Sequence, residues 1–439
     1  MWNNLPTEIS NNILHRLPVK TLIKCTILSK SFLSSITSHD FISDHIAQHN
    51  NSHLLLRYFT HDKQEMYHLD PDDDTFSGFQ TQGLLVPFLA YPKQCFTVVG
   101  CINGVLCLVN DLLMEGTLII LWNPSIRKFV HVPRPILVFN LIGAYTSVCG
   151  FGFDPISDDY KVVRLVEQDT DDGFSSQTLV EVYSLKSECW RVIDKGPCYD
   201  IKDSRCGYTP RFINGSVYWL GKPYVAPYNE TVLLKFDMST ESFETIQLPG
   251  DLKLSEFRFT QDLYVQENKG ILTLLKSNYD DGNNTFSAWI LKEDGVVKSW
   301  KKIFDFDIAK LPHARALALA FSFYINFDIS KLSLHGRPLA FSFRKKGEVI
   351  MVKSGRDGYP KEESEIVSID PVTQSGTTVR EINADRNLFY LSTYVESMVL
   401  FKEGKGIEEQ NTKLDLFPRN KPHSSVLHSS SSSGEHLAS

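Results

Sequence analysis

Residues 5–46 read LPTEISNNILHRLPVKTLIKCTILSKSFLSSITSHDFISDHI, and this stretch has the periodicity of short amphipathic helices. Pro18 ends the first helix, because a proline removes a backbone donor and clashes with the preceding turn. Ser38 suits the N-cap of the last helix. The residues that recur at helical spacing are Ile9, Ile13, Leu14 and Leu17, then Thr21, Leu22, Cys25 and Leu28, then Phe32, Leu33 and Ile36, then Phe41, Ile42, His45 and Ile46. The stretch therefore predicts a compact unit of three or four helices.

A unit of this size is near the lower limit for a self-sufficient hydrophobic core. Its apolar residues outnumber those that one small core can hide, so part of its surface should meet a partner. The pattern alone leaves two interpretations open. The unit is either a cap on the domain that follows or an adaptor module that joins that domain to another protein.

From Leu54 onward the chain changes to short runs rich in Val, Ile, Leu, Phe and Tyr, which is typical of an all-β domain. One kind of turn between these runs is a tight glycine hairpin, found at Asn103-Gly104, Asn214-Gly215, Lys269-Gly270 and Lys346-Gly347. Asn-Gly favours the type I′ turn, because both residues accept positive φ. A strand, a short polar turn and another strand follow each hairpin, as in LWNPSIRKFVHV and KFDMSTESFETI. A four-strand unit of roughly 55 residues is what a β-propeller blade requires.

The first blade is incomplete, because residues 54–79 hold only three of its strands. We expect residues 389–401, FYLSTYVESMVLF, to supply the fourth strand, since this exchange closes the ring and pairs strand edges that would otherwise be open. The expected propeller then has six blades. The fold class is multidomain, with a small N-terminal helical unit followed by an all-β propeller.

One unit of the repeat is longer than the others. The segment FDIAKLPHARALALAFSF (306–323) is followed by a near-tandem copy, FDISKLSLHGRPLAFSF (327–343). The sequence leaves open whether this is a true duplication or a gene-model error. In either case only one copy can pair in the ring.

Residues 5–46 resemble an F-box, the motif that binds a Skp-type adaptor in cullin-based ubiquitin ligases. The resemblance lies in Leu5-Pro6, Glu8-Ile9, Ile13-Leu14, Leu17-Pro18-Val19-Lys20, Leu22, the Lys30-x-Phe32 pair, Ile36 and Asp40-Phe41. Phe32 stands where the family usually has Trp, and Leu28-Ser29 replaces the usual Val-Cys. The resemblance implies that the adaptor-binding residues are Leu5, Pro6, Ile9, Ile13, Leu14, Leu17, Pro18, Leu22, Lys30 and Phe32.

Residues 50–401 are similar to the F-box-associated domain, a kelch-like propeller that follows the F-box in a large plant family. The two resemblances imply a non-catalytic substrate-recognition subunit of an SCF-type (Skp–cullin–F-box) ubiquitin ligase. The F-box would bind the Skp-type adaptor, and through it cullin, while the propeller would bind a target protein whose identity and contact residues the sequence does not give. The alternative is a propeller enzyme or carbohydrate-binding module with an incidental helical cap.

The domain boundaries that we expect are 1–47 for the F-box, 48–401 for the propeller and 402–439 for a tail. The tail combines charge, proline and a serine run, so it should be disordered.

The composition limits the partners. A net charge of −7 argues against a nucleic-acid-binding surface, which normally carries a basic bias. No apolar run reaches the ~18 residues of a membrane span, and no secretory signal is visible, so we expect the cytoplasm, the nucleus or both. The eight cysteines form no Cys-x-x-Cys pair, so we expect neither a metal site nor a cofactor. Without a Gly-x-Ser-x-Gly, Walker or Gly-x-Gly-x-x-Gly motif, we expect no catalytic residues.

Overall fold

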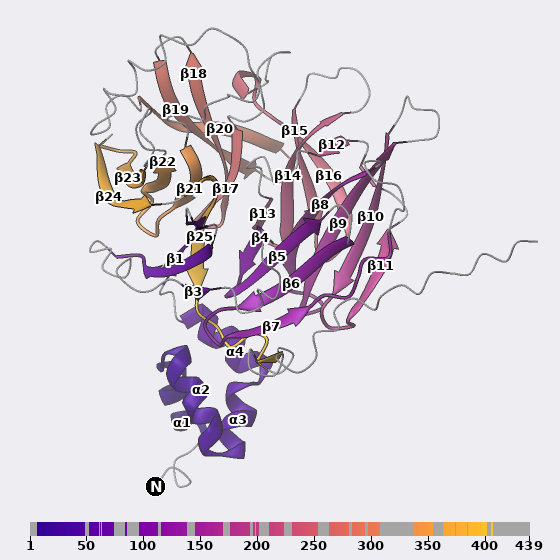
Figure 1. Ribbon diagram of the computed structural model, residues 1–439, viewed down its shortest axis with the longest axis vertical. Helices are drawn as coiled ribbons and strands as arrows, with labels where there is room; N and C mark the ends of the chain where they lie inside the picture. The colour runs from indigo at the N-terminus through magenta and orange to yellow at the C-terminus, as the bar shows by residue number, and fades with distance from the viewer. Residues whose placement is uncertain are drawn as a thin grey trace, which may run out of the picture.

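The computed structural model shows a helical module beneath a ring of β-sheets (Figure 1). It describes residues 7–48, 52–60, 62, 64–73, 84–85, 96–112, 116–137, 145–169, 176–193, 196–197, 199–201, 210–223, 231–252, 263–280, 283–294, 297–307, 338–353, 363–373, 375–383, 385–401 and 405–406.

Four helices form the module, as the periodicity predicts: α1 (Thr7–His15), α2 (Val19–Leu28), α3 (Lys30–Ile36) and α4 (His39–Gln48). Ser29 separates α2 from α3, and its Oγ accepts a hydrogen bond from the Phe32 N–H at 3.0 Å. Ser38 Oγ accepts from the Phe41 N–H at 3.3 Å, so the predicted N-cap of the last helix is confirmed. None of the helices that the structure describes is long and apolar enough to cross a bilayer.

The strands form six sheets, which are the six predicted blades. The blades are numbered along the chain and their strands are given from the axis outward: blade 1 holds β25 (Asp385–Val395), β1 (Ser52–Phe59), β2 (Glu65–Pro71) and β3 (Leu84–Leu85), and blade 2 holds β4 (Thr97–Ile102), β5 (Val105–Leu112), β6 (Gly116–Asn123), β7 (Lys128–His131) and β26 (Lys405–Gly406). Blade 3 holds β8 (Tyr145–Asp154), β9 (Asp159–Asp169), β10 (Ser176–Ser184) and β11 (Cys189–Ile193), and blade 4 holds β13 (Arg211–Ile213), β14 (Ser216–Pro223), β15 (Val232–Asp237) and β16 (Ser242–Gln247), with β12 (Tyr199–Ile201) also paired to β14. Blade 5 holds β17 (Leu263–Asn268), β18 (Ile271–Asp280), β19 (Asn283–Asp294) and β20 (Val297–Asp307), and blade 6 holds β21 (Pro338–Phe343), β22 (Val349–Lys353), β23 (Glu363–Asp370) and β24 (Ser375–Asn383). A short 3-10 helix, Gly250–Leu252, follows β16.

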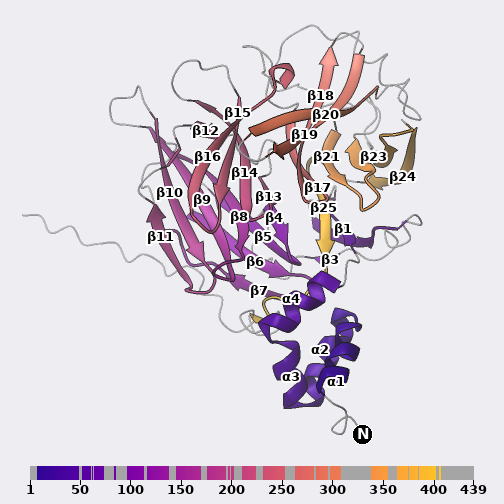
Figure 2. The ribbon, with the colours of Figure 1, turned by 180° about the vertical axis from the view of Figure 1, so that it is seen from behind.

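The ring closes through β25, which pairs antiparallel with β1 and lies innermost in blade 1. The sequence placed the closing strand at 389–401, but the strand begins at Asp385 and ends at Val395. Residues 396–401 leave the sheet and turn toward the helices, which Figures 1 and 2 show where β25 descends to α4. The third strand of blade 1 is also displaced from the predicted range 54–79, because it is β3.

Three of the four glycine hairpins have positive φ at both central residues, as a type I′ turn requires: 49° and 77° at Asn103-Gly104, 47° and 78° at Asn214-Gly215, and 52° and 77° at Lys269-Gly270. At Lys346-Gly347 only the glycine has positive φ. These turns join the first and second strands of blades 2, 4, 5 and 6.

The second kind of turn is held by a side chain at its start. Asn123 Oδ1 accepts from the Ser125 N–H at 3.0 Å, and Asp237 Oδ1 accepts from the Ser239 N–H at 3.0 Å. These Asx turns replace backbone pairing where the chain reverses.

Two predictions concern the C-terminal part of the chain, the tail and the repeated segment. The expected tail starts at residue 402, yet β26 pairs with β7 at the outer edge of blade 2, so that boundary is too early. The rest of the tail, 407–439, lies outside the described residues. The end of the second repeat copy forms β21, the inner strand of blade 6, while residues 308–337 also lie outside the description.

Adjacent blades are tied together by buried polar groups. Lys161 Nζ of blade 3 donates to the Met238 carbonyl that follows β15 in blade 4, at 2.8 Å. Asp154 accepts from Lys161 Nζ at 2.8 Å and Ser157 Oγ at 2.5 Å, and from Ser239 Oγ of the next blade at 2.5 Å. Burial raises the pKa of the Asp154 carboxyl, but these hydrogen bonds lower it by a larger amount. The pKa therefore lies well below its ordinary value.

Replacing Asp154 with Asn should therefore weaken the protein most near neutral pH. A carboxyl whose folded-state pKa is depressed contributes stability above its unfolded pKa of about 3.9, and this contribution is lost as the pH falls through the folded pKa. We expect Asp154→Asn to lower the free energy of unfolding at pH 7 and to flatten its decline below pH 4. Urea unfolding at a series of pH values measures both effects. Parallel pH profiles for the variant and the wild type would contradict this role.

Candidate functional site: the outer surface of the helical module

The interior of the helical module contains residues from both the helices and the propeller. Leu14, Leu22, Ile36 and Phe41 are buried in one cluster, which also includes Ile126 and Met398. Ile126 lies in the β6–β7 turn, and Met398 follows the closing strand. The module therefore does not complete its core from its own sequence, in line with its small size.

Four large apolar side chains on the module face solvent. They are Ile9 (48% exposed), Ile27 (83%), Leu28 (73%) and Leu33 (40%). Ile27 and Leu28 end α2, and the extended backbone of Ser29 directs the chain into α3 at this point. We call these four residues the apolar strip. Large apolar side chains exposed on a small domain are candidates for contact with a protein partner.

The ten predicted adaptor-binding residues occupy three environments. Leu14 and Leu22 are buried and pack in the interior of the module, so a role for them in adaptor binding stays a prediction. Ile13, Leu17 and Phe32 are partly buried, and the last two pack against the same interior. The exposed members are Ile9, Pro18 and Lys30. Leu5 and Pro6 lie outside the described residues.

Sequence reasoning missed the most exposed members of the strip, Ile27 and Leu28, together with Leu33. Leu28 and Leu33 fall at the same helical spacing as residues that are buried, so periodicity placed them on the inner side. The signal that separates them is local. Ser29 caps α3 and ends α2 directly after Leu28, so the end of α2 projects away from the interior.

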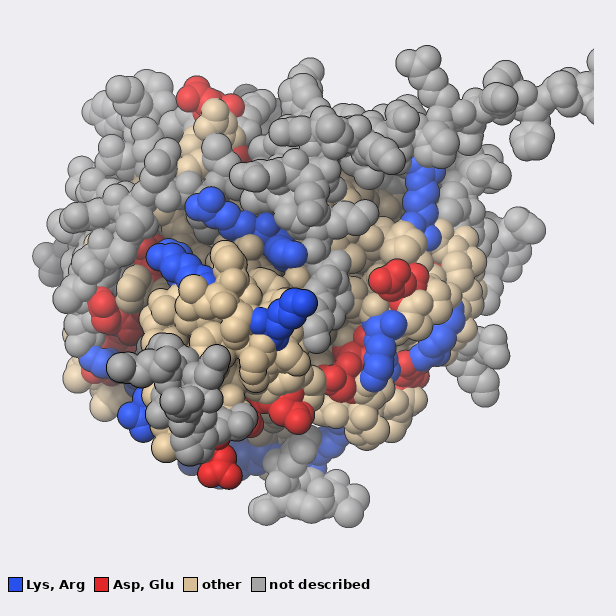
Figure 3. Space-filling model, turned by 90° about the horizontal axis from the view of Figure 1, so that it is seen from below, with Lys and Arg blue, Asp and Glu red and all other residues tan. Residues whose placement is uncertain are grey.

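The exposed charges of the module are unevenly distributed. Arg16, Lys20, Lys24 and Lys30 are exposed, and no Asp or Glu lies between residues 9 and 39. The view from below shows Lys and Arg side chains among uncharged surface on this face (Figure 3). The exposed charges of residues 9–38 are therefore all basic, although the whole chain carries a net charge of −7. Such a surface complements an acidic partner.

Comparison with known proteins identifies the two parts of the chain. Residues 2–44 match the F-box domain family, and residues 54–324 match the F-box associated beta propeller domain. The second match covers more than half of the chain. The chain belongs to this family. The F-box protein CPR1 of Arabidopsis thaliana is 30% identical over 325 residues, which are 68% of this chain and 72% of that protein. The F-box protein At4g22390 of the same plant is 27% identical over 325 residues, 68% of this chain and 73% of that protein.

These matches confirm the F-box and its associated propeller. They describe no kelch repeat in this chain, so the kelch-like character stays a prediction. The acidic and histidine-bearing segments form no group of three potential metal ligands within the part of the chain that the structure describes.

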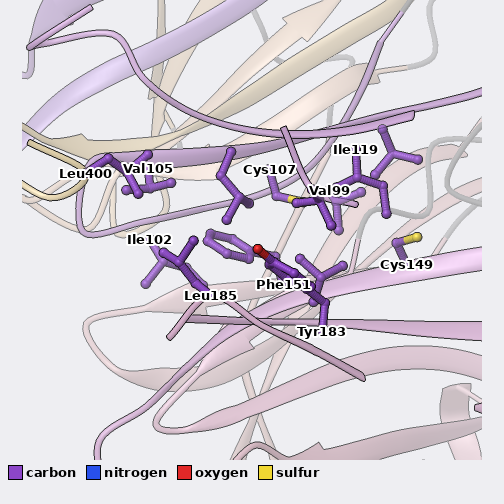
Figure 4. Packing of buried hydrophobic residues seen from close by; sticks show 14 of the residues in the cluster. Val99, Ile102, Val105, Cys107, Ile119, Cys149, Phe151, Tyr183, Leu185 and Leu400 are labelled. Carbon is purple, nitrogen blue, oxygen red and sulfur yellow. The ribbon is translucent and has the colours of Figure 1, made fainter. Parts of the chain in front are cut away.

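The F-box is docked on the propeller through α4. Ile42 and Ile46 pack against a buried cluster of blades 2 and 3 that contains Val399 and Leu400. Figure 4 shows Leu400 beside Val105 in this cluster. At the start of α4, His39 Nε2 lies 2.7 Å from Asp158 Oδ1, in the β8–β9 turn. The contact surface therefore includes both apolar packing and a polar contact.

Residues 396–401, which we call the closing segment, follow β25 and contact both blade 2 and the F-box. Asn123, which is fully buried, donates from Nδ2 to the carbonyls of Ser397 at 3.0 Å and Val399 at 2.9 Å. Ser397 Oγ donates to the Asn103 carbonyl at 2.5 Å. A Cβ on Gly104 would lie 2.6 Å from the Val395 carbonyl oxygen, so this hairpin needs glycine for close approach as well as for its positive φ. The closing segment thus ties the F-box to the strand that closes the ring.

The target-binding residues remain unassigned. The residues that link β5 to β6, β9 to β10 and β14 to β15 lie partly or wholly among those that the structure does not describe.

Proposed function

We propose that this F-box protein is the substrate-recognition subunit of an SCF-type ubiquitin ligase. The observation that carries the proposal is the apolar strip, with Ile27 and Leu28 exposed on an F-box that packs against the propeller through other residues. In this proposal the strip and the exposed basic residues of the F-box bind an acidic Skp-type adaptor, and through it cullin. The propeller binds the target protein.

The mechanism is proximity rather than chemistry at a catalytic residue. A target held beside a ubiquitin-conjugating enzyme presents its lysines at a high effective concentration. The fixed contact between α4 and the propeller supports this mechanism, because it limits the orientations in which a bound target can be presented. The similarity to F-box proteins supports a non-catalytic subunit. We further propose that it acts in the cytoplasm, the nucleus or both.

The decisive variant replaces Ile27 and Leu28 together with Asp in the full chain. A charge placed in a desolvated contact costs several kcal/mol when it is unpaired. We expect adaptor affinity to fall by about a hundredfold or more, while the melting temperature stays unchanged, because both positions are exposed. Titration of purified adaptor against the variant measures the loss. The full chain is needed because Ile126 and Met398 complete the F-box interior.

Val372→Asp is the matched control, because Val372 is 88% exposed on a turn of blade 6. It places one Asp at an exposed apolar position on the propeller and should change adaptor affinity less than about twofold. Adaptor binding by the Ile27/Leu28 variant at the level of this control would refute the proposed interface.

A further inference from the structure

Among the residues that the structure describes, the innermost strands of the propeller carry one positively charged side chain. Strands β4, β8, β13, β17, β21 and β25 each contact the next around the axis. Arg211, the first residue of β13, is the only Lys or Arg on these strands whose side chain the structure describes. It is partly exposed, so the positive charge is neither fully buried nor on the outer surface.

The side chain of Arg211 crosses the axis of the ring. Its guanidinium carbon lies 5.3 Å from the centre of the Tyr390 ring on β25, and blade 1 lies opposite blade 4 in a ring of six. Its Nε donates to Gln266 Oε1 of blade 5 at 3.2 Å. Strand β4 of blade 2, which carries Cys101, also contacts β13. The guanidinium lowers the pKa of the Cys101 thiol, although burial dominates and raises that pKa to about 12. Residues from four blades therefore meet around one positive charge.

The four cations of the propeller that the structure shows as buried each have a carboxylate partner. Arg57 lies 2.8 Å from Glu65, Arg164 lies 2.6 Å from Glu181, and Lys161 lies 2.8 Å from Asp154. Arg344 likewise lies 2.8 Å from Asp72. Arg211 makes no ion pair with any residue that the structure describes, and its neighbours Gln266, Tyr390 and Cys101 are neutral. A guanidinium that is partly withdrawn from water and faces neutral groups is stabilised when an anion reaches it, so this position is complementary to one.

We propose that the propeller axis binds one carboxylate of the target protein, with Arg211 as its counter-ion. This inference rests on the proposed function and specifies the chemistry of the target. One guanidinium among neutral hydrogen-bonding groups matches a single negative charge, whereas a doubly charged phosphate would need further cations. Arginine also offers paired N–H donors that match the two oxygens of a carboxylate. The carboxylate belongs either to an Asp or Glu side chain or to a chain terminus.

The test presents the purified full chain with three immobilised octapeptide libraries. The first is amidated and lacks Asp and Glu, the second is amidated with one Asp or Glu at its centre, and the third lacks Asp and Glu but has a free C-terminal carboxylate. We expect one carboxylate library to retain about tenfold more protein than the first, because charge-assisted hydrogen bonds exceed neutral ones in strength. Preference for the second library identifies a side chain, and preference for the third identifies a terminus. Equal retention by all three libraries would overturn the inference.

Arg211→Met removes the charge and keeps most of the side-chain volume, so it should abolish the preference. Arg211→Lys keeps the charge without the paired donors and should retain part of it. Lys301→Met, on the exposed face of β20, makes the same charge change elsewhere and should have no effect. If Arg211 only holds the blades together, Arg211→Met lowers the melting temperature and the wild-type protein shows no preference among the libraries. The wild-type measurement decides the inference even if Arg211→Met does not fold.

The outcome is separable from that of the proposed function. Adaptor binding that responds to the Ile27/Leu28 variant, together with equal library retention, would remove only the carboxylate site. A carboxylate preference without any adaptor binding by the F-box would leave the axial site standing and remove the ligase assignment.

Discussion

Ending the chain at Glu396 should lower the melting temperature of the whole protein and release the F-box from the propeller. This truncation leaves β25 intact but removes Met398, Val399 and Leu400, which are all buried. At about 1.5–3 kcal/mol for each buried side chain, the loss is roughly 5 kcal/mol or more. It also leaves the Nδ2 group of Asn123 without its two carbonyl acceptors. Thermal unfolding measures the first effect, and limited proteolysis between α4 and β1 measures the second.

The control ends the chain after Gly406. It keeps the closing segment and β26 and removes only 407–439, so its melting temperature should match that of the full chain. Equal melting temperatures for the two truncations would show that the closing segment contributes nothing measurable to the fold.

Replacing Glu181 with Ala should be among the most destabilising single changes in the propeller. Glu181 Oε1 lies 2.6 Å from Arg164 Nη1, and both side chains are almost completely buried. Glu181 Oε2 accepts from the N–H groups of Ile136 and Leu137, in the chain that follows blade 2. The variant leaves a buried guanidinium without its anion and two backbone donors without an acceptor. We expect a loss of about 3–5 kcal/mol in the free energy of unfolding, measured by urea denaturation.

A double substitution of Glu181 and its partner Arg164 separates the effect of the unpaired charge from that of the other contacts. Removing both charges as Glu181→Leu/Arg164→Leu should recover much of the loss, because an apolar pair no longer carries an uncompensated charge. Asp305→Ala, which breaks the exposed pair with Lys302, should cost less than about 1 kcal/mol. A double variant as unstable as Glu181→Ala alone would show that the backbone contacts, rather than the ion pair, dominate.

Features with a local cause could be predicted from the sequence. Ser38 predicted the start of α4, and Asn103-Gly104 predicted a hairpin. A helix cap and a tight turn both depend on the chemistry of a few adjacent residues. The blade count followed from turns that recur because each blade repeats the same unit. The family resemblance added the adaptor site, but it did not distinguish buried Leu14 from exposed Ile9.

Features that depend on distant contacts could not be predicted in the same way. Ser397 to Phe401 continue the apolar character of β25, so periodicity extended the strand beyond Val395. These residues are buried because their side chains pack against the F-box and blade 2, and not because they pair as a strand in a sheet. Leu400 has a φ of 68°, a conformation that does not belong to an extended strand. The solitary charge of Arg211 likewise becomes visible only when the blades close around it.

The two ends of the polypeptide are interdependent, and this constrains how the protein is made. A ribosome releases the four helices long before it synthesises Met398, which fills part of their interior. The nascent F-box must therefore wait for almost the whole chain before its core is complete. A product of premature termination would carry the helices without this residue and without the strand that closes the ring. The F-box core is therefore complete only in a chain that has been translated to the end of the propeller.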